Sequence, residues 1–571
     1  MAHGHRAWAC RSGLVAMWAL FACYDGTSRG DGEGGGATAD DDAGSGGGAS
    51  ADDGADDDGG PALEPFVPGE LVLPRLTASQ YRNALVDLLG PGLPPTPVEG
   101  DTNPYLFYSI GAASTTLSEL GTQLYEEAAD TVTHAVFDDP VRRVELVGCE
   151  PVAAADGCVA GYLAQFGRRA FRRPLTEAEH SRYLAMAAEL AQPDAWEGLR
   201  LAVAGMLQSP YFLYRVEIGA PDPEDPTRLR YSGYEMASRM SFLLWDSIPD
   251  DLLLAAAERG ELDTREGLEA EALRLLADER ASASIRAFFA QYLDLGRLDG
   301  LTRDPELYPL FTATMPDSMR TETELVIDDV VFREKGDVRT IFSTRRTFVN
   351  DELATLYGID APGAGPITFV PVELPEDGAR AGILTLGGFL TMNARQTKTS
   401  PTLRGRYLRE RVLCQTVPDP PPDVNTDLQP SGDEPETVRE QLEQHRENPA
   451  CAACHAFIDP PGLLFENFDA AGVYRTEELG KPIDASGDLD GIPLDNARGL
   501  ADVLAEDPRI GLCIVRQLFR HAQGRLDTPD ELPVLENLGA RFEAVDYRFD
   551  ALLVELVTHD GFRTAVAKEG A

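Results

Sequence analysis

The chain has 571 residues, which is enough for several domains. Hydrophobic residues make up 43% of it and aromatic residues 8%, as is typical of a globular protein with a buried core. The formal net charge at pH 7 is −45. Such a charge repels phosphate groups and anionic lipids, so it argues against nucleic acid and anionic membrane surfaces as electrostatic partners.

The N-terminus has the pattern of an export signal. Arg6 and Arg11 precede an apolar stretch, residues 13–22, that is too short to span a bilayer. The stretch ends in Leu-Phe-Ala-Cys, which resembles the lipobox of bacterial lipoproteins. We predict that residues 1–23 are a signal peptide and that Cys23 is lipidated, with ordinary signal cleavage near the same position as the alternative. Both outcomes place the protein in the cell envelope, in the periplasm or at the outer membrane.

Residues 24–66 are dominated by small and acidic residues. Such a composition cannot bury enough apolar surface to fold, so we expect a disordered, acidic, Gly-rich tether. No later segment has the length and apolarity of a transmembrane helix. The lipid anchor is therefore the expected membrane contact.

The rest of the chain predicts a mostly α-helical fold. In residues 79–89, apolar side chains recur on one helical face, Thr77 fits the N-cap, and Gly90 ends the helix. Further amphipathic helices are predicted at residues 177–190, 197–207, 233–245, 264–296 and 317–333. The best strand signal is residues 367–372.

Residues 451–455 form a Cys-x-x-Cys-His motif, the strongest chemical signal in the sequence. Two thiols one helical turn apart can each form a thioether to haem, and the histidine then binds the iron as proximal ligand. The motif predicts one covalent haem c, held by Cys451, Cys454 and His455. The following Ile-Asp-Pro-Pro-Gly, residues 458–462, is expected to stop any helix.

Three other uses of the cysteine pair stay open. Zinc would need further Cys or His ligands, and none follows before Cys513. A thioredoxin-like site would need a strand before the motif and a long helix after it. The third alternative is an inert disulfide between Cys451 and Cys454.

The remaining cysteines suit an oxidising compartment. Cys149 and Cys158 would close a short loop as a disulfide, and Cys414 and Cys513 are left as a pair by elimination.

The sixth iron ligand is an open choice. No Met follows Met392, and the histidines nearest the motif or after it are His445, His521 and His559. We predict Met392 as the distal ligand, with a vacant sixth site as the alternative. As structural alternatives, Met392 fills the core, His445 is solvated or caps its helix, and His521 packs inside the protein.

Two charged segments have weaker signals. The basic run from Arg395 to Arg411 could supply donors to haem propionates, or be an ordinary surface helix. Asp484, Asp488 and Asp490 hint at a calcium loop but lack its terminal Glu, so we interpret them as an acidic turn.

Several longer motifs resemble one known family. Arg-Ala-Phe-Arg-Arg-Pro-Leu-Thr at 169–176, Ser-Pro-Tyr-Phe-Leu-Tyr-Arg at 209–215 and Arg-Met-Ser-Phe-Leu-Leu-Trp at 239–245 are similar to segments of the multidomain planctomycete and myxobacterial DUF1592 proteins. The haem motif with Asp459-Pro460 and Glu466-Asn467-Phe468-Asp469 resembles their cytochrome-c-like segment. One departure is Ile458, where relatives often have Met.

The resemblance implies a helical body with a C-terminal cytochrome-c-like domain. The implied order is a DUF1587-like domain at 67–140, a DUF1595-like domain at 141–220, a DUF1592-like domain at 228–360, a DUF1588-like haem domain at 376–480 and a DUF1585-like domain at 488–566. The family itself supplies no activity.

We therefore expect an exported monohaem cytochrome-like lipoprotein that transfers electrons to or from a redox partner protein. Two alternatives remain. One is a haem enzyme that reduces peroxide or oxidises a substrate at an open iron site. The other is a surface binding or scaffolding lipoprotein without haem.

Overall fold

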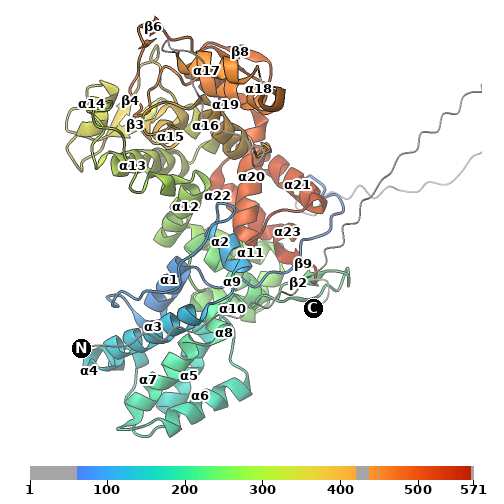
Figure 1. Ribbon diagram of the computed structural model, residues 1–571. Coiled ribbons are helices and arrows are strands. Elements are labelled where there is room, and N and C mark those ends of the chain that lie inside the picture. The colour runs from blue at the N-terminus through green and yellow to red at the C-terminus, as the bar shows by residue number, and fades with distance from the viewer. Residues whose placement is uncertain (1–60, 420–435, 448, 568–571) are drawn as a thin grey trace, which may run out of the picture. The chain divides into compact units, whose positions relative to one another are not determined.

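A computed structural model of the chain describes residues 61–419, 436–447 and 449–567 (Figure 1). The predicted signal peptide, Cys23 and the tether up to residue 60 lie outside these residues. In the described part, 23 α-helices and four small sheets make the protein mostly α-helical, as predicted. No helix in this part is long and apolar enough to cross a membrane.

The first group of helices packs around its own hydrophobic core, which includes Tyr81, Val132 and Phe212. The Thr77 hydroxyl accepts a hydrogen bond from the Gln80 backbone N–H while the Gln80 side chain accepts one from the Thr77 backbone, so the predicted N-cap is confirmed. The helices of this group are α1 Ala78–Leu89, α3 Glu119–Phe137, α4 Pro140–Val147, α5 Gly157–Ala170, α6 Glu177–Glu189, α7 Ala195–Leu207 and α8 Pro210–Leu213. The short helix α2 Tyr108–Ser114 lies between α1 and α3 in the sequence, but its Ile110 belongs to the second core described next.

The middle of the chain belongs to a second and larger core. The helix predicted at 264–296 is two helices, because the Asp278 side chain caps a new one by accepting from the Arg280 N–H. The helix predicted at 317–333 continues as a π-helix, η3 Asp329–Glu334. The α-helices here are α9 Gly233–Trp245, α10 Asp251–Glu258, α11 Arg265–Leu276, α12 Glu279–Tyr292, α13 Met315–Asp328 and α14 Asp351–Tyr357.

The C-terminal part adds nine helices, seven of which contribute side chains to the same large core. A small satellite core, made of Val438, Leu442 and Leu463, joins α17 to α18. The helices are α15 Gly387–Met392, α16 Pro401–Tyr407, α17 Val438–His445, α18 Pro449–Leu463, α19 Ala497–Glu506, α20 Pro508–Gln523, α21 Leu532–Ala544, α22 Phe549–Thr558 and α23 Asp560–Arg563. The π-helix η6 Leu408–Val412 directly extends α16.

The strands form short antiparallel pairs. The predicted strand at 367–372 is present as β4 Val370–Glu373, paired with β3 Arg346–Val349. The other strands are β1 Ala220–Pro221, β2 Leu229–Arg230, β5 Glu477–Glu478, β6 Lys481–Pro482, β7 Gly487–Leu489, β8 Ile492–Leu494 and β9 Thr564–Ala565. β9 pairs with β2, which also pairs with β1, and Val566 bridges to Glu70, so segments near the two ends of the described chain are bonded together.

Two disulfides are formed in the described residues. Cys149 is bonded to Cys158, at a sequence separation of 9, and Cys414 to Cys513, at a separation of 99. The second bond joins the end of η6 to α20 and so links two distant parts of the chain.

Candidate functional site

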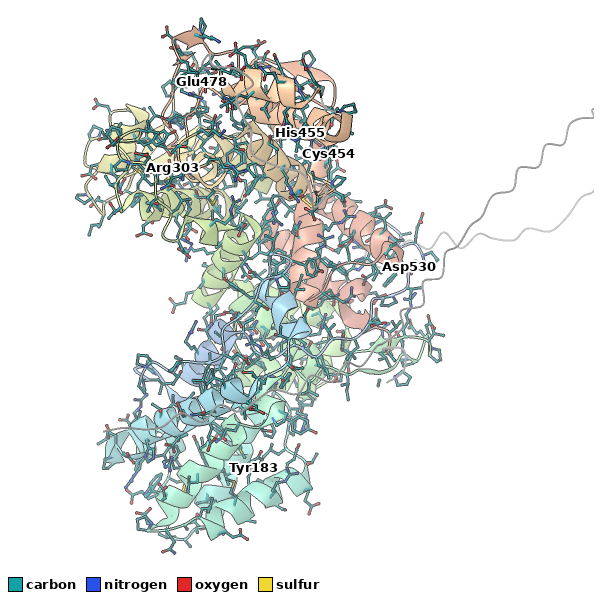
Figure 2. The ribbon with its side chains drawn as sticks, viewed as in Figure 1. Tyr183, Arg303, Cys454, His455, Glu478 and Asp530 are labelled. Atoms are coloured by element: carbon teal, nitrogen blue, oxygen red, sulfur yellow. A yellow bond between two sulfur atoms is a disulfide. The ribbon has the colours of Figure 1, made fainter. Side chains whose placement is uncertain are left out.

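Helix α18 holds the whole Cys-x-x-Cys-His motif. Cys451 and Cys454 lie one turn apart, and Figure 2 labels Cys454 and His455 side by side on this helix. Both thiols are free, whereas every other cysteine of the described residues is in a disulfide. The side chain of Cys451 is buried and that of Cys454 is partly exposed. The structure therefore does not contain the inert disulfide considered above.

The imidazole of His455 is bonded to a buried carboxylate. Its Nδ1 lies 2.9 Å from Oδ2 of Asp459, one turn further along α18. Asp459 is 0% exposed and its Oδ1 accepts a hydrogen bond of 2.8 Å from the Thr402 hydroxyl of α16. An ionised carboxylate only accepts, so Nδ1 is the protonated nitrogen and Nε2 has the lone pair that can bind a metal.

The helix does not stop at the predicted Ile-Asp-Pro-Pro-Gly, and that prediction is wrong. α18 continues through Pro460 and Pro461 to Leu463. A proline inside a helix deprives the carbonyl four residues earlier of its N–H donor. For Pro461 this carbonyl belongs to Phe457, and it accepts a 3.1 Å hydrogen bond from Nε of Arg409 instead. A side chain from η6 thus replaces the missing backbone donor.

Helices α16 and α18 cross at very short range because glycines face each other's backbones. A β-carbon on Gly405 would overlap the carbonyl oxygen of Ile458, and one on Gly462 would overlap that of Pro401. This close crossing brings Thr402 to Asp459. It fixes the carboxylate behind His455.

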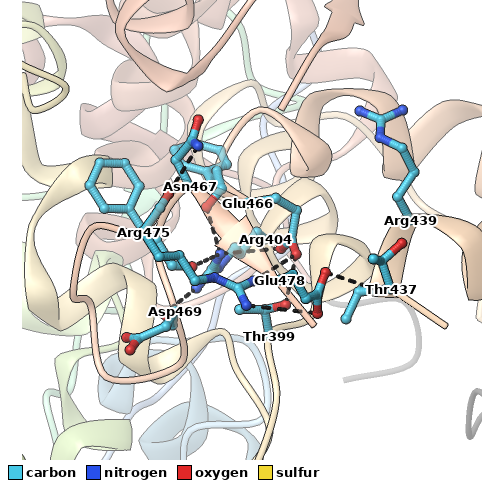
Figure 3. A network of polar contacts seen from close by, with 12 residues as sticks. Thr399, Arg404, Thr437, Arg439, Glu466, Asn467, Asp469, Arg475 and Glu478 are labelled. Carbon is cyan, nitrogen blue, oxygen red and sulfur yellow. Dashed lines mark hydrogen bonds and ion pairs between the residues drawn. The ribbon is translucent and has the colours of Figure 1, made fainter. Parts of the chain in front are cut away.

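The loop after α18 is held by three buried arginines. Arg404 donates to the carbonyls of Phe465, Phe468 and Asp469, each at 2.9 Å (Figure 3). Arg303 donates to Ala470 and Arg380 to Gly472. Burial lowers the pKa of Arg404 to about 10, opposed by its ion pair with Glu466. Arginines from three parts of the chain therefore bind the carbonyls of the loop at residues 465–472, which contains the Glu-Asn-Phe-Asp motif.

The basic run thus has structural partners. Arg404 is fully buried, and Arg409 forms an ion pair of 2.5 Å with Asp490 and lies 4.0 Å over the Phe457 ring. Arg406 pairs with Glu410 and Asp419. Asp490 and Gly491 form the two-residue turn between β7 and β8. Both have positive φ angles, as the central residues of a tight hairpin turn often do.

Met392 and His445 lie in different surroundings. Met392 ends α15, is 5% exposed, and belongs to the large hydrophobic core. His445 ends α17, and its ring lies 4.5 Å from that of His455 at an angle of 70°. Burial and the nearby His455 lower the pKa of His445, which favours its neutral form. Met392 as sixth ligand stays a prediction, and His445 is the histidine that the structure brings to the motif.

The two later histidines are inside the protein. His521 packs against the rings of Phe107 and Phe288, as the packing alternative proposed, and His559 bonds to Asn537 and Gly561. Across residues 61–419, 436–447 and 449–567, no group of three or more His, Cys, Asp or Glu side chains is arranged to hold a metal ion. The zinc interpretation therefore has no ligand set in these residues.

Comparison with protein-family models gives four matches in sequence order. They are DUF1595 at residues 158–217, DUF1592 at 231–359, DUF1588 at 380–478 and DUF1585 at 490–562, each described as a protein of unknown function. The chain is a multidomain protein of the DUF1592 type. The short name of the DUF1588 model, PSCyt3, points to a cytochrome-like segment, and its match includes Cys451, Cys454 and His455.

For this DUF1592-type protein, no curated protein and no solved structure gives a significant match. The domain bounds inferred from the sequence, including the DUF1587-like domain at 67–140, stay predictions. Of the three buried arginines that hold the loop after α18, Arg303 lies in the DUF1592 segment, and Arg380 and Arg404 lie in the DUF1588 segment. The cytochrome-like segment of the DUF1592-type protein is thus bonded to the segment before it.

The contacts around His455 were not predicted from the sequence. Asp459 was visible as the acid one helical turn after the histidine, but the expected helix stop at 458–462 hid that spacing. Thr402 and Arg409 had no local signal, because their contacts depend on how α16 and η6 cross α18.

Proposed function

We propose that this protein is an exported monohaem c-type cytochrome-like lipoprotein that transfers electrons at the cell envelope. The observation that supports it best is the pairing of two free thiols with an imidazole whose Nδ1 is bonded to a buried carboxylate. This donor set matches what a covalently bound haem needs.

Each residue of the motif has a defined role in this proposal. Cys451 and Cys454 form the two thioether bonds, and His455 binds the iron through Nε2 while Asp459 holds its Nδ1 proton. The haem supplies a centre that exchanges one electron without proton or group transfer. A redox partner protein would be the other member of the exchange.

The free state of the thiols supports covalent attachment over a structural disulfide. In an oxidising compartment, the other four described cysteines pair and these two do not. The predicted signal peptide and Cys23 would place the domain where c-type haem is attached, and lipidation of Cys23 would hold it at the membrane surface.

The deciding experiment is expression in a host that attaches c-type haem, followed by mass spectrometry and acid–acetone extraction. The purified protein should gain the mass of one haem and keep its colour after extraction. Changing both Cys451 and Cys454 to Ala should abolish both the added mass and the retained colour. Changing both Cys149 and Cys158 to Ala removes two cysteines elsewhere and should leave the haem in place. A natural-sequence protein without covalent haem would overturn the proposal.

Optical spectra separate electron transfer from haem catalysis. Sharp α and β bands of a low-spin reduced state support electron transfer. A high-spin ferric spectrum that changes with cyanide or peroxide would favour the haem enzyme instead. The anchor is tested with Cys23→Ser, which should abolish labelling by a radioactive fatty acid and release the protein from membranes.

A further inference from the structure

A buried aspartate side chain lies directly behind the proposed iron ligand. Asp459 has no exposed surface, and its two carboxylate oxygens are bonded to His455 Nδ1 at 2.9 Å and to the Thr402 hydroxyl at 2.8 Å. A carboxylate that accepts the outer N–H of a ligating histidine fixes the ring orientation and makes the imidazole more basic. Both effects act on the metal through the histidine.

The carboxylate is held in place from two helices. It lies on α18 one turn after His455, and the contact with Thr402 comes from α16. These helices cross at very short range, because Gly405 and Gly462 each lie against a backbone carbonyl of the other helix. His445 of α17 is the other titratable group that faces the imidazole, across a ring contact of 4.5 Å.

We propose that Asp459 is a positioning residue that lowers the reduction potential of the haem iron, an inference that rests on the proposed function. The ferric iron has one more positive charge than the ferrous iron. A more basic imidazole and a nearby buried carboxylate therefore stabilise the ferric state more. The centre suits a partner protein that donates electrons at low potential.

The test is Asp459→Asn in the haem-loaded protein, because Asn has nearly the same shape without the charge. In spectroelectrochemical titration at one pH, the ratio of ferrous to ferric iron at a fixed potential should rise by about tenfold, or ~59 mV for one electron. Glu477→Gln is the matched control, because it makes the same change from a carboxylate to an amide at an exposed position of the DUF1588 segment. The control should leave the potential unchanged.

A second variant separates charge from packing. Thr402→Val removes the hydroxyl from Asp459 but keeps the carboxylate, so it should not raise the potential. An equal rise in both variants, or no rise in Asp459→Asn, overturns the role of Asp459. Mass spectrometry on the same samples keeps the two proposals apart. Natural-sequence protein without covalent haem overturns both, whereas covalent haem with an unchanged potential overturns this one alone.

Discussion

Gly405 of α16 lies against the backbone carbonyl oxygen of Ile458 in α18, with no room for a β-carbon between them. The obstacle is backbone and not a flexible side chain, so it cannot move aside. The two helices are therefore closer than any other residue at this position would allow. The contact between Thr402 and Asp459 depends on this spacing.

Gly405→Ala should destabilise the protein by about 1–3 kcal/mol, because the added methyl group forces the helices apart. Urea unfolding followed by circular dichroism measures the change. The control is Gly161→Ala in α5, where the space beyond the glycine is open and Ala should stabilise the helix by about 0.5–1 kcal/mol. If the two substitutions changed the free energy of unfolding equally, the close crossing of α16 and α18 would be contradicted.

Removal of the Cys414–Cys513 bond should cost more stability than removal of Cys149–Cys158. The sequence separations are 99 and 9, and a longer closed loop restricts the unfolded chain more. In the chain-entropy account, the long loop is worth about 4–5 kcal/mol and the short one about 3 kcal/mol or less. Thermal melts of the two double Cys→Ala variants, without reductant, compare them. The opposite order would contradict this account.

His521 should make the protein sensitive to acid. Burial lowers the pKa of this histidine to about 4, from an unfolded value of 6.5. Between these two values the unfolded chain binds the proton and the folded protein does not, so stability falls as the pH drops from 6.5 to 4. The loss is about 3 kcal/mol, since one pKa unit is worth about 1.4 kcal/mol.

His521→Phe should reduce this acid sensitivity, because Phe keeps the packing against Phe107 and Phe288 without a proton site. The measurement is the midpoint of urea unfolding at pH 4.5 and 7. If His521→Phe keeps the full acid sensitivity, His521 is not its source.

Glu322 should have the opposite effect on the pH dependence of stability. It is 0% exposed, accepts hydrogen bonds from Tyr357 at 2.5 Å and Thr347 at 2.7 Å, and burial raises its pKa to about 7 from 4.5. The folded protein binds the proton more tightly here, so stability is lost as the pH rises from 4.5 to 7. Glu322→Gln should remove this loss and raise the melting temperature more at pH 8 than at pH 5. An equal change in the melting temperature of Glu322→Gln at both pH values would disprove this role of Glu322.

Met392→Ala tests the predicted sixth ligand. If the Met392 sulfur binds the iron of the loaded protein, its loss should convert a low-spin spectrum to a high-spin one. Met315→Ala is the control, because Met315 is equally buried in the same core. An unchanged spectrum in Met392→Ala together with a high-spin spectrum in His445→Ala would assign the second imidazole as ligand instead.

The helices with strong local signals were predictable residue by residue. Thr77 and Gly90 bound α1 as predicted, because a capping hydroxyl and a glycine with φ of 85° act through neighbouring backbone atoms. The break at Asp278 was missed, because apolar periodicity continues across a cap. The continuation of α18 through two prolines was missed for a different reason: its replacement donor, Arg409, comes from another helix.

Apolar periodicity along the chain was enough to predict the helical class, the resemblance of several motifs indicated the family, and residue spacing identified the Cys451, Cys454 and His455 motif. The groups that surround this motif could be identified from the packing of the helices alone. Asp459 and Thr402 meet behind His455 because two glycines let α16 and α18 touch through their backbones, and His445 reaches the ring because α17 packs beside α18. Such contacts depend on distances between segments, which no local pattern of residues encodes.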